Sequence, residues 1–384
     1  MTGVQTCALP IWTTFSADQV DFNFREPAVL IEMLDILLFY VHHKARYIRL
    51  DAVGLLWKEL GTSCMHLPET HEIIKLMRYV IRLFTNTHLV TETNVPHLEN
   101  ISYFGNGYDE ASMVYQFPLP PLTLHTFLTG NAKHMNAWLN TLKLESDQTT
   151  FFNFLSSHDG IGMRPVDGLL SAEEKEYLVN HTIEQGGRIN YRSLSDGKQV
   201  PYELNITYLD ALSKHDSTHE MNLLRFFAAH ALLFSVIGVP AIYIHSLVGS
   251  RNDIEGVRVS GINRRISRKK LEYISLAKEL KDINHERYII HHTLKTMIKL
   301  RKNHLAFHPN AKQEVMFINE RCISFIRSYQ NEKMLVLINV TDTQLDVSIP
   351  YHGIDIISHQ WMEHDVKLAP YQYVWMKLDA VINR

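Results

Sequence analysis

Three acidic residues follow short apolar segments at the points where those segments end. Asp51 closes the run RYIRLD, Glu92 closes HLVTE and Asp159 closes FFNFLSSHD. Carboxylates of this kind can act as a nucleophile and as a general acid/base, and glycoside chemistry requires a pair of them flanking the glycosidic bond. Each acid alone is more typical of a helix N-cap or a solvated loop. The three together, with Arg49 and His158 beside two of them, favour a catalytic site.

The 22 histidines invite a metal hypothesis, but their spacing argues against one. They are scattered along the chain, and the adjacent pairs His42–His43 and His291–His292 form no carboxylate-backed ligand set at helical spacing. Surface or core histidines are therefore expected, and no metal ion.

The elements that must hold the three acids alternate between helical and strand-like patterns. Residues 27–45 and 68–85 have helical apolar spacing, and each is followed by a short apolar run, at 46–53 and 88–93. The series continues with runs at 112–117, 151–157 and 239–247 and with helical stretches at about 119–144 and 222–236. Strands separated by helices of this length predict a parallel sheet with right-handed crossovers, buried on both faces. The acids then fall at the carboxyl ends of strands, where (β/α)8 barrels build their active sites.

The pattern changes after about residue 308. Short strand-like runs, separated by turn residues such as Asn331 and Asp342, predict a small antiparallel C-terminal β domain over residues 309–384. The preceding part has only five clear strand and helix units, whereas a closed (β/α)8 barrel needs eight. Residues 12–308 are therefore expected to form a partial (β/α)8 TIM barrel that lacks its first strands, with an acceptor-side loop insertion at about 164–218.

The first eleven residues, MTGVQTCALPI, have no capping residue, no periodicity and no basic segment. They resemble the translation of a sequencing adapter. We expect a non-native leader over residues 1–11, on a natural protein that is longer at its N-terminus.

Composition argues against several classes of protein. With 38 Lys+Arg against 41 Asp+Glu and a net charge of −3, no basic excess is present for binding nucleic acid. The longest apolar stretch, Ala228 to Ile244, is interrupted by polar residues, a glycine and a proline and is too short to span a membrane. The three cysteines, Cys7, Cys64 and Cys322, form neither a disulfide framework nor a C-x-x-C pair, so a reducing, cytoplasmic location is expected.

Four segments carry a family resemblance: YIRLDAVGLLWKELGTSC, LVTETN, VYQFPLPPLTLHTFLTG and LSSHDGIG. They resemble the α-amylase superfamily of glycoside hydrolases and, within it, the sucrose phosphorylase branch, to which GTSC and PLPPL are peculiar. The resemblance runs from Trp12 to roughly Arg301. It implies retaining α-glucosyl transfer through a covalent glucosyl-enzyme intermediate, with a small-molecule α-glucoside and inorganic phosphate as partners and no cofactor.

The resemblance also implies roles for the acids and their neighbours. Asp51 falls at the position of the nucleophile, Glu92 at that of the acid/base and Asp159 at that of the carboxylate that stabilises the oxocarbenium-like state. Arg49 would orient the nucleophile, and His158 would bind sugar hydroxyls. The chemistry agrees, because Arg49 favours an ionised Asp51, and we expect other carboxylates near Glu92 to raise its pKa.

Two further segments bear on the substrate. QVPYELNITYLDAL resembles the mobile acceptor-side loop of the branch, with Tyr202 and Glu203 where sucrose-specific members carry a Tyr and a Gln. Spacing alone would favour an ordinary surface loop. In GINRRISRKKL the resemblance singles out Arg268 as an arginine lining the site, although a basic run is usually a solvated face. Because Glu203 puts a charge where those members have a neutral amide, we expect sucrose to be a poor substrate.

Departures from the family pattern leave alternatives open. The early Asp…Asn-His segment and the loop that carries a phosphate-side arginine are missing from the sequence, so phosphate as acceptor depends on the branch resemblance. Glucosylglycerate is favoured over sucrose 6-phosphate as substrate, and the chain as written is expected to be inactive. A hydrolase or transglucosidase of the same superfamily is the alternative enzyme. A non-catalytic carbohydrate-binding relative is the alternative of another class, and the presence of all three acids counts against it.

Overall fold

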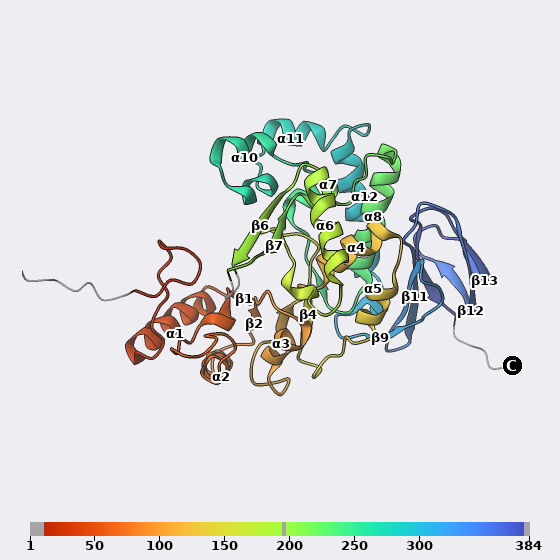
Figure 1. The fold of residues 1–384 in the computed structure, drawn as a ribbon. Coiled ribbons are helices and arrows are strands. Elements are labelled where there is room, and N and C mark those ends of the chain that lie inside the picture. The colour runs from red at the N-terminus through yellow and green to blue at the C-terminus, as the bar shows by residue number, and fades with distance from the viewer. Residues whose placement is uncertain (1–10, 194–196, 380–384) are drawn as a thin grey trace, which may run out of the picture. The chain divides into compact units, whose positions relative to one another are not determined.

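The computed structural model describes residues 11–193 and 197–379, and the chain divides into two compact units. Of the described residues, unit 1 holds 11–93 and 102–113, and unit 2 holds the others (Figure 1). Residues 1–10 of the expected leader lie outside the described residues. None of the helices in the described part of the chain combines the length and the apolar character needed to cross a membrane.

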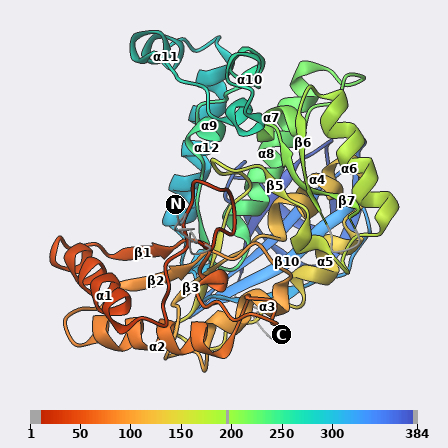
Figure 2. The same cartoon turned by 60° about the vertical axis from the view of Figure 1, so that its left-hand side comes forward.

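Unit 1 is built from two helices and two parallel strands. Its elements are α1 (Pro27–His42), β1 (Tyr47–Leu50), η1 (Val53–Leu55), α2 (Pro68–Arg82), β2 (His88–Thr91) and η2 (Ser102–Phe104). Both long helices begin with proline, which suits a first turn because no N–H is needed there. The helices lie side by side (Figure 2). β1 and β2 pair in parallel from Tyr47↔His88 to Leu50↔Thr91, so the residues that follow the two strands emerge at one edge.

Unit 2 contains the remaining helices. β3 (Met113–Tyr115) begins at the last residue of unit 1 and continues in unit 2. The elements of unit 2 that precede the C-terminal sheet are α3 (His97–Ile101), α4 (Leu119–Thr129), α5 (Lys133–Leu139), β4 (Thr150–Asn153), β5 (Ile161–Gly162), η3 (Arg164–Val166), α6 (Ala172–Glu184), β6 (Arg188–Ser193), β7 (Gln199–Asn205), α7 (Tyr208–Ala211), α8 (His219–Ser235), β8 (Val239–Pro240), α9 (Ile244–Leu247), α10 (Ile254–Ser260), η4 (Asn263–Ser267), α11 (Tyr273–Glu279), α12 (Glu286–Lys302) and η5 (Leu305–Phe307). β4 and β8 pair in parallel. α8 is almost wholly buried and packs on both α12 and β11.

The last part of the chain forms a six-stranded antiparallel sheet. Its strand order is β13-β12-β14-β11-β10-β9. The strands are β9 (Lys312–Val315), β10 (Cys322–Tyr329), β11 (Glu332–Asn339), β12 (Leu345–Asp355), β13 (Trp361–Leu368) and β14 (Tyr373–Leu378). The buried Arg327 of β10 donates to the carbonyl of Ser235 at 2.6 Å, which ties the sheet to the end of α8. The predicted α/β fold, with parallel strands and helices followed by an antiparallel sheet, is confirmed.

Three local predictions are wrong. The helix predicted over 119–144 is interrupted, because Gly130 takes a left-handed conformation (φ 66°) that ends α4. The strand predicted over 239–247 stops after two residues, and a helical turn begins at Ile244. The stretch 164–218 is not a loop but holds α6, the antiparallel pair β6–β7 and α7.

A buried histidine makes the stability of unit 2 sensitive to acid. His230 of α8 is 1% exposed, and burial lowers its pKa to about 4. The unfolded chain takes up that proton near pH 6.5, so the stability that the neutral imidazole contributes is complete above pH 6.5 and is lost as the pH falls toward 4. We expect the free energy of unfolding to fall by about 2 kcal/mol between pH 7 and pH 5 through this residue.

Urea unfolding of His230→Leu at the two pH values tests this expectation, because leucine removes the titrating group and keeps the site apolar. The difference between pH 7 and pH 5 should shrink by about 2 kcal/mol in the variant. His42→Leu, an exposed histidine at the end of α1, is the matched control and should leave the difference unchanged. An unchanged pH dependence in His230→Leu would contradict the assignment.

Candidate active site

Two of the predicted catalytic acids are neighbours in unit 1. Asp51 directly follows β1 and Glu92 directly follows β2, and the N–H of Glu92 donates to the carbonyl of Leu50 at 3.1 Å. Arg49, on β1, contacts both acids. Its Nη1 lies 2.6 Å from Asp51 Oδ1, and its Nη2 lies 3.8 Å from Glu92 Oε1. One guanidinium therefore holds both carboxylates.

The backbone after Asp51 also contributes to this cluster. Ala52 has a φ of 45°, in the left-handed region that a residue with a Cβ rarely adopts, and its N–H donates to Glu92 Oε2 at 2.9 Å. Backbone strain of this kind persists only where the surrounding structure enforces it, and it gathers at functional sites. The sequence predicted carboxylates around Glu92. The structure places an amide N–H and a guanidinium against it, and Asp51 is linked to it through the shared Arg49.

The third acid lies in unit 2, held by two arginines. Asp159 Oδ1 is 2.8 Å from Arg264 Nη1 and 3.2 Å from Arg268 Nη2. His158 Nε2 is 3.5 Å from Asp159 Oδ2, and the carbonyl of His158 accepts from Arg268 Nε at 2.6 Å. The run GINRRISRKKL is therefore not merely a solvated face, because two of its arginines engage this acid.

Glu203 is buried. It lies on β7 with 2% of its surface exposed, and its two oxygens accept from Arg264 Nε and Nη2 at 3.0 and 2.9 Å. Asn190 Nδ2, on β6, donates to Glu203 Oε2 at 3.0 Å. Burial alone would lower the pKa of Arg264, but its contacts with Glu203 and Asp159 outweigh this and raise it. The segment resembling an acceptor-side loop is therefore a strand that positions an arginine.

Of the residues around Glu203, the sequence pointed to Tyr202 but not to Arg264. Tyr202, the neighbour of Glu203 on β7, lies where the register of β6 and β7 shifts, and it is among the groups that raise the pKa of Arg264. The family resemblance singled out Arg268, yet Arg264 is the residue that joins Glu203 to Asp159. A buried carboxylate requires a partner, and that rule would have favoured a bidentate arginine once the burial of Glu203 was known.

The predicted residues thus form two clusters, one in each unit. Arg49, Asp51 and Glu92 belong to the cluster of unit 1, and His158, Asp159, Glu203 and Arg268, with the added Arg264, belong to that of unit 2. Within residues 11–193 and 197–379, no group of three His, Cys, Asp or Glu side chains has the arrangement of a metal site.

Comparison with known proteins identifies a catalytic domain and several relatives of this chain. The model of the α-amylase catalytic domain matches residues 11–165. Over 371 residues the chain is 47% identical to the glucosylglycerate phosphorylase of Escherichia coli (strain K12), an alignment that covers 96% of this chain and 66% of that protein. Residues 11–165 therefore match the α-amylase catalytic domain. The predicted resemblance is confirmed, and the sucrose phosphorylase of Agrobacterium vitis is a more distant relative, 30% identical over 67% of this chain and 51% of that protein.

Solved structures of the family share the fold. The crystal structure of sucrose 6F-phosphate phosphorylase from Thermoanaerobacter thermosaccharolyticum matches with a TM-score of 0.74 at 20% identity, covering 93% of this chain and 68% of that one. At that identity the likeness shows the α-amylase-family fold alone. The chain spans just under two thirds of the length of the glucosylglycerate phosphorylases that it matches, at 66% and 65% for the proteins of E. coli and Allomeiothermus silvanus.

Proposed function

We propose that the protein is a retaining α-glucoside phosphorylase that converts 2-O-α-glucosylglycerate and phosphate into α-glucose 1-phosphate and glycerate. The observation that carries this proposal is the 47% identity to the glucosylglycerate phosphorylase of E. coli over 96% of the chain, against 30% identity to a sucrose phosphorylase over 67%. The clusters around Asp51 and Asp159 supply the side chains that the reaction needs.

The first half-reaction uses the acids of unit 1. The Asp51 carboxylate attacks the anomeric carbon, the glycosidic C–O bond breaks, and Glu92 donates a proton to the departing glycerate oxygen. With both carboxylates ionised, the cluster with Arg49 carries one net negative charge, and it is neutral when Glu92 holds the proton. Arg49 orients the nucleophile through its 2.6 Å contact with Asp51.

The second half-reaction uses the same residues in reverse. A phosphate oxygen attacks the anomeric carbon, the bond between that carbon and Asp51 breaks, and Glu92 takes the proton that phosphate gives up. Two inversions give net retention, so the product is the α-phosphate. Phosphate acts as co-substrate, and no cofactor or metal is required by these steps.

Asp159 is assigned to stabilise the oxocarbenium-like transition state, with His158 as a partner of sugar hydroxyls. Two arginines against one oxygen of Asp159 fix the direction in which this carboxylate points. Such preorganisation is useful in catalysis because no reorganisation energy is spent during the reaction.

The acceptor gives the arginines of unit 2 a second role. Glycerate carries a carboxylate, which planar guanidinium groups recognise well, whereas the fructose released from sucrose is neutral. Arg264 and Arg268 are the cationic groups of this cluster, with 37% and 38% of their side chains exposed. Glu203 then acts on the acceptor through Arg264 and does not contact it.

The experiment that tests this function compares 2-O-α-glucosylglycerate, sucrose and sucrose 6-phosphate with phosphate present. Because the chain as written is expected to be inactive, it is extended with the segments of the E. coli glucosylglycerate phosphorylase that it does not match. We expect kcat/KM for glucosylglycerate to exceed the other two by about 10²-fold, because a site built for one polar group rejects analogues that leave it unpaired. One phosphate should be consumed for each α-glucose 1-phosphate released. The E. coli glucosylglycerate phosphorylase serves as positive control.

Two outcomes would overturn the proposal. Release of free glucose without consumption of phosphate would identify a hydrolase, the alternative of the same family. Fastest turnover of plain sucrose would contradict the choice of glycerate as acceptor.

The proposed location is the cytoplasm, with a small α-glucoside and phosphate as partners. Cys64 and Cys322 are both free and buried, as a reducing compartment allows. Burial raises the pKa of Cys322 to about 12, so its thiol stays protonated and unreactive.

A further inference from the structure

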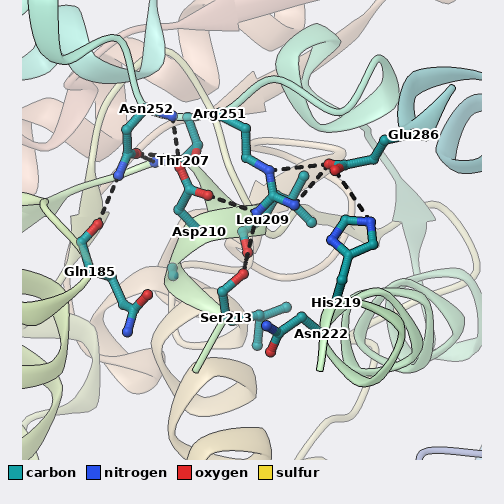
Figure 3. Close-up of polar contacts among 12 residues, drawn as sticks. Gln185, Thr207, Leu209, Asp210, Ser213, His219, Asn222, Arg251, Asn252 and Glu286 are labelled. Carbon is teal, nitrogen blue, oxygen red and sulfur yellow. Dashed lines mark hydrogen bonds and ion pairs between the residues drawn. The ribbon is translucent and has the colours of Figure 1, made fainter. Parts of the chain in front are cut away.

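Three consecutive residues, Arg251, Asn252 and Asp253, open the segment that carries Arg264 and Arg268. This segment runs through α10 and η4 and has no strand of its own. Arg251 and Asn252 both contact Asp210 of α7 and have further partners on other elements (Figure 3), and Asp253 bonds within the segment itself.

Arg251 fixes the start of the segment to two helices. Its Nη1 donates to Asp210 Oδ1 of α7 at 2.8 Å, and its Nη2 lies 2.8 Å from Glu286 Oε1 at the start of α12. Burial would lower the pKa of Arg251, but the bonds to Asp210 and Glu286 raise it above its usual value. On the far side of Glu286 lies His219, with Nε2 3.5 Å from Oε2 (Figure 3).

Asn252 joins the segment to one end of the β6–β7 pair, where β6 begins and β7 ends. Its Oδ1 accepts from the backbone N–H of Thr207 at 2.9 Å, and its Nδ2 donates to the carbonyl of Gln185 at 3.0 Å. Gln185 ends α6, just before β6, and Thr207 follows β7. A backbone N–H can only donate and a carbonyl can only accept, so these two partners fix the orientation of the amide.

Asp253 closes the segment on itself. Its N–H donates to the carbonyl of Ile266 in η4 at 2.9 Å, and its Oδ2 is 3.4 Å from Arg265 Nη2. The side chain also caps α10 by accepting from the N–H of Gly256 at 3.1 Å. These bonds hold η4 next to Asp253.

The start of the segment and the base of the strand pair are therefore joined at Asn252, and the two meet again at the ion pair of Arg264 with Glu203, two residues before the end of β7. We propose that Asn252, supported by Arg251, is a positioning residue that sets Arg264 and Arg268 against Glu203 and Asp159. It touches none of the reacting atoms. This proposal rests on the proposed function for the part that concerns the acceptor, whereas the positioning itself is a property of the fold.

A residue with this role differs from one that merely stabilises the fold. Loss of a merely structural side chain would loosen unit 2 as a whole or lower the amount of folded protein. Loss of a positioning side chain should loosen β6, β7 and η4 and leave α12 and the C-terminal sheet as they were.

Hydrogen exchange measured by mass spectrometry on the full 384-residue chain separates the two. Asn252→Ala removes all three side-chain bonds, two from Thr207 and one to Gln185. Asn252→Asp keeps an acceptor for Thr207 but turns an oxygen toward the carbonyl of Gln185, and as the milder change it covers the case in which the alanine variant fails to fold. Asn284→Ala and Asn284→Asp, at an exposed asparagine after α11, are the matched controls.

We expect exchange in 188–193, 199–205 and 263–267 to rise about tenfold in the Asn252 variants, with wild-type exchange in α12 and β10–β11. The Asn284 variants should match the wild type throughout. Unchanged exchange in both Asn252 variants would overturn the proposal, and so would an equal rise across α12 and the C-terminal sheet.

Kinetics of the reverse reaction provide the second readout. We expect the Asn252 variants to raise KM for glycerate about tenfold and to leave KM for α-glucose 1-phosphate within about twofold. A rise of both constants together would identify a structural role. These kinetics are measured on the extended chain, and absence of phosphorylase turnover in its wild-type form, tested beside the E. coli relative, would count against the proposed function and would leave the exchange result to decide the positioning.

Discussion

Asp51→Asn is expected to abolish glucosyl transfer, with kcat lower by about 10⁴-fold or more, the loss typical of removing one member of a catalytic set. Asparagine has the same shape but no charge, so it cannot form the covalent glucosyl ester. Its amide also gives up the charge-assisted contact of 2.6 Å with Arg49. Initial rates of α-glucose 1-phosphate formation from glucosylglycerate provide the measurement.

The companion variant Glu92→Gln is expected to behave differently with different donors. It should lose most activity on glucosylglycerate, whose glycerate must be protonated to depart, and keep a substantial rate on α-glucosyl fluoride, whose leaving group needs no acid. Only the acid/base role is relieved by an easy leaving group. Asp51→Asn should be inactive on both donors, since both must form the ester.

The matched control is Asp35→Asn, which makes the same change at an exposed carboxylate of α1 and should leave every rate unchanged. The same substitutions are made at the aligned acids of the E. coli relative, so that the roles are measured in a protein of its full length. Equal losses on both donors for both variants would refute the assignment of Asp51 and Glu92.

Local rules account for the parts of unit 1 that the sequence predicted well. Pro27 and Pro68 mark the first turns of α1 and α2, and the apolar runs that follow each helix are β1 and β2. Because parallel strands in register end at one edge, the adjacency of Asp51 and Glu92 followed from the pattern alone. The break at Gly130 could also have been predicted, since glycine after an apolar helical run is a typical helix end.

Other features depend on tertiary contacts that periodicity does not encode. The partner of Glu203 lies 61 residues away, and a sequence does not show that an acid between Tyr202 and Leu204 will be 2% exposed. Pro350 and Gly353 interrupt the alternation of β12, and the structure accommodates Pro350 where the register of β12 and β13 shifts, between Ser348 and His352. The left-handed Ala52 had no signal at all, because alanine gives no local reason for a positive φ.

Arg264→Met is expected to lower the free energy of unfolding of unit 2 by about 3 kcal/mol. Methionine keeps much of the volume of the arginine side chain, so the loss comes from leaving the carboxylate of Glu203 buried without its bidentate partner. Breaking a buried ion pair from one side costs about 3–5 kcal/mol, and we take the lower limit because 37% of the Arg264 side chain is exposed and solvent screens the pair. Urea unfolding at pH 7 measures the change.

Two further variants show whether the unpaired charge is the cause. In Arg264→Met with Glu203→Met no buried charge is left unpaired, because Asp159 keeps Arg268, so most of the stability should return, as it does when apolar side chains replace both members of a buried pair. Arg264→Lys keeps the charge but cannot form two parallel bonds, so it should lie between wild type and Arg264→Met. Arg258→Met, which breaks the exposed pair with Glu255 on α10, is the control and should change stability by less than about 1 kcal/mol. If the double variant were as unstable as Arg264→Met, the loss would come from packing, and Glu203 would not be the reason that this arginine is held where Asp159 needs it.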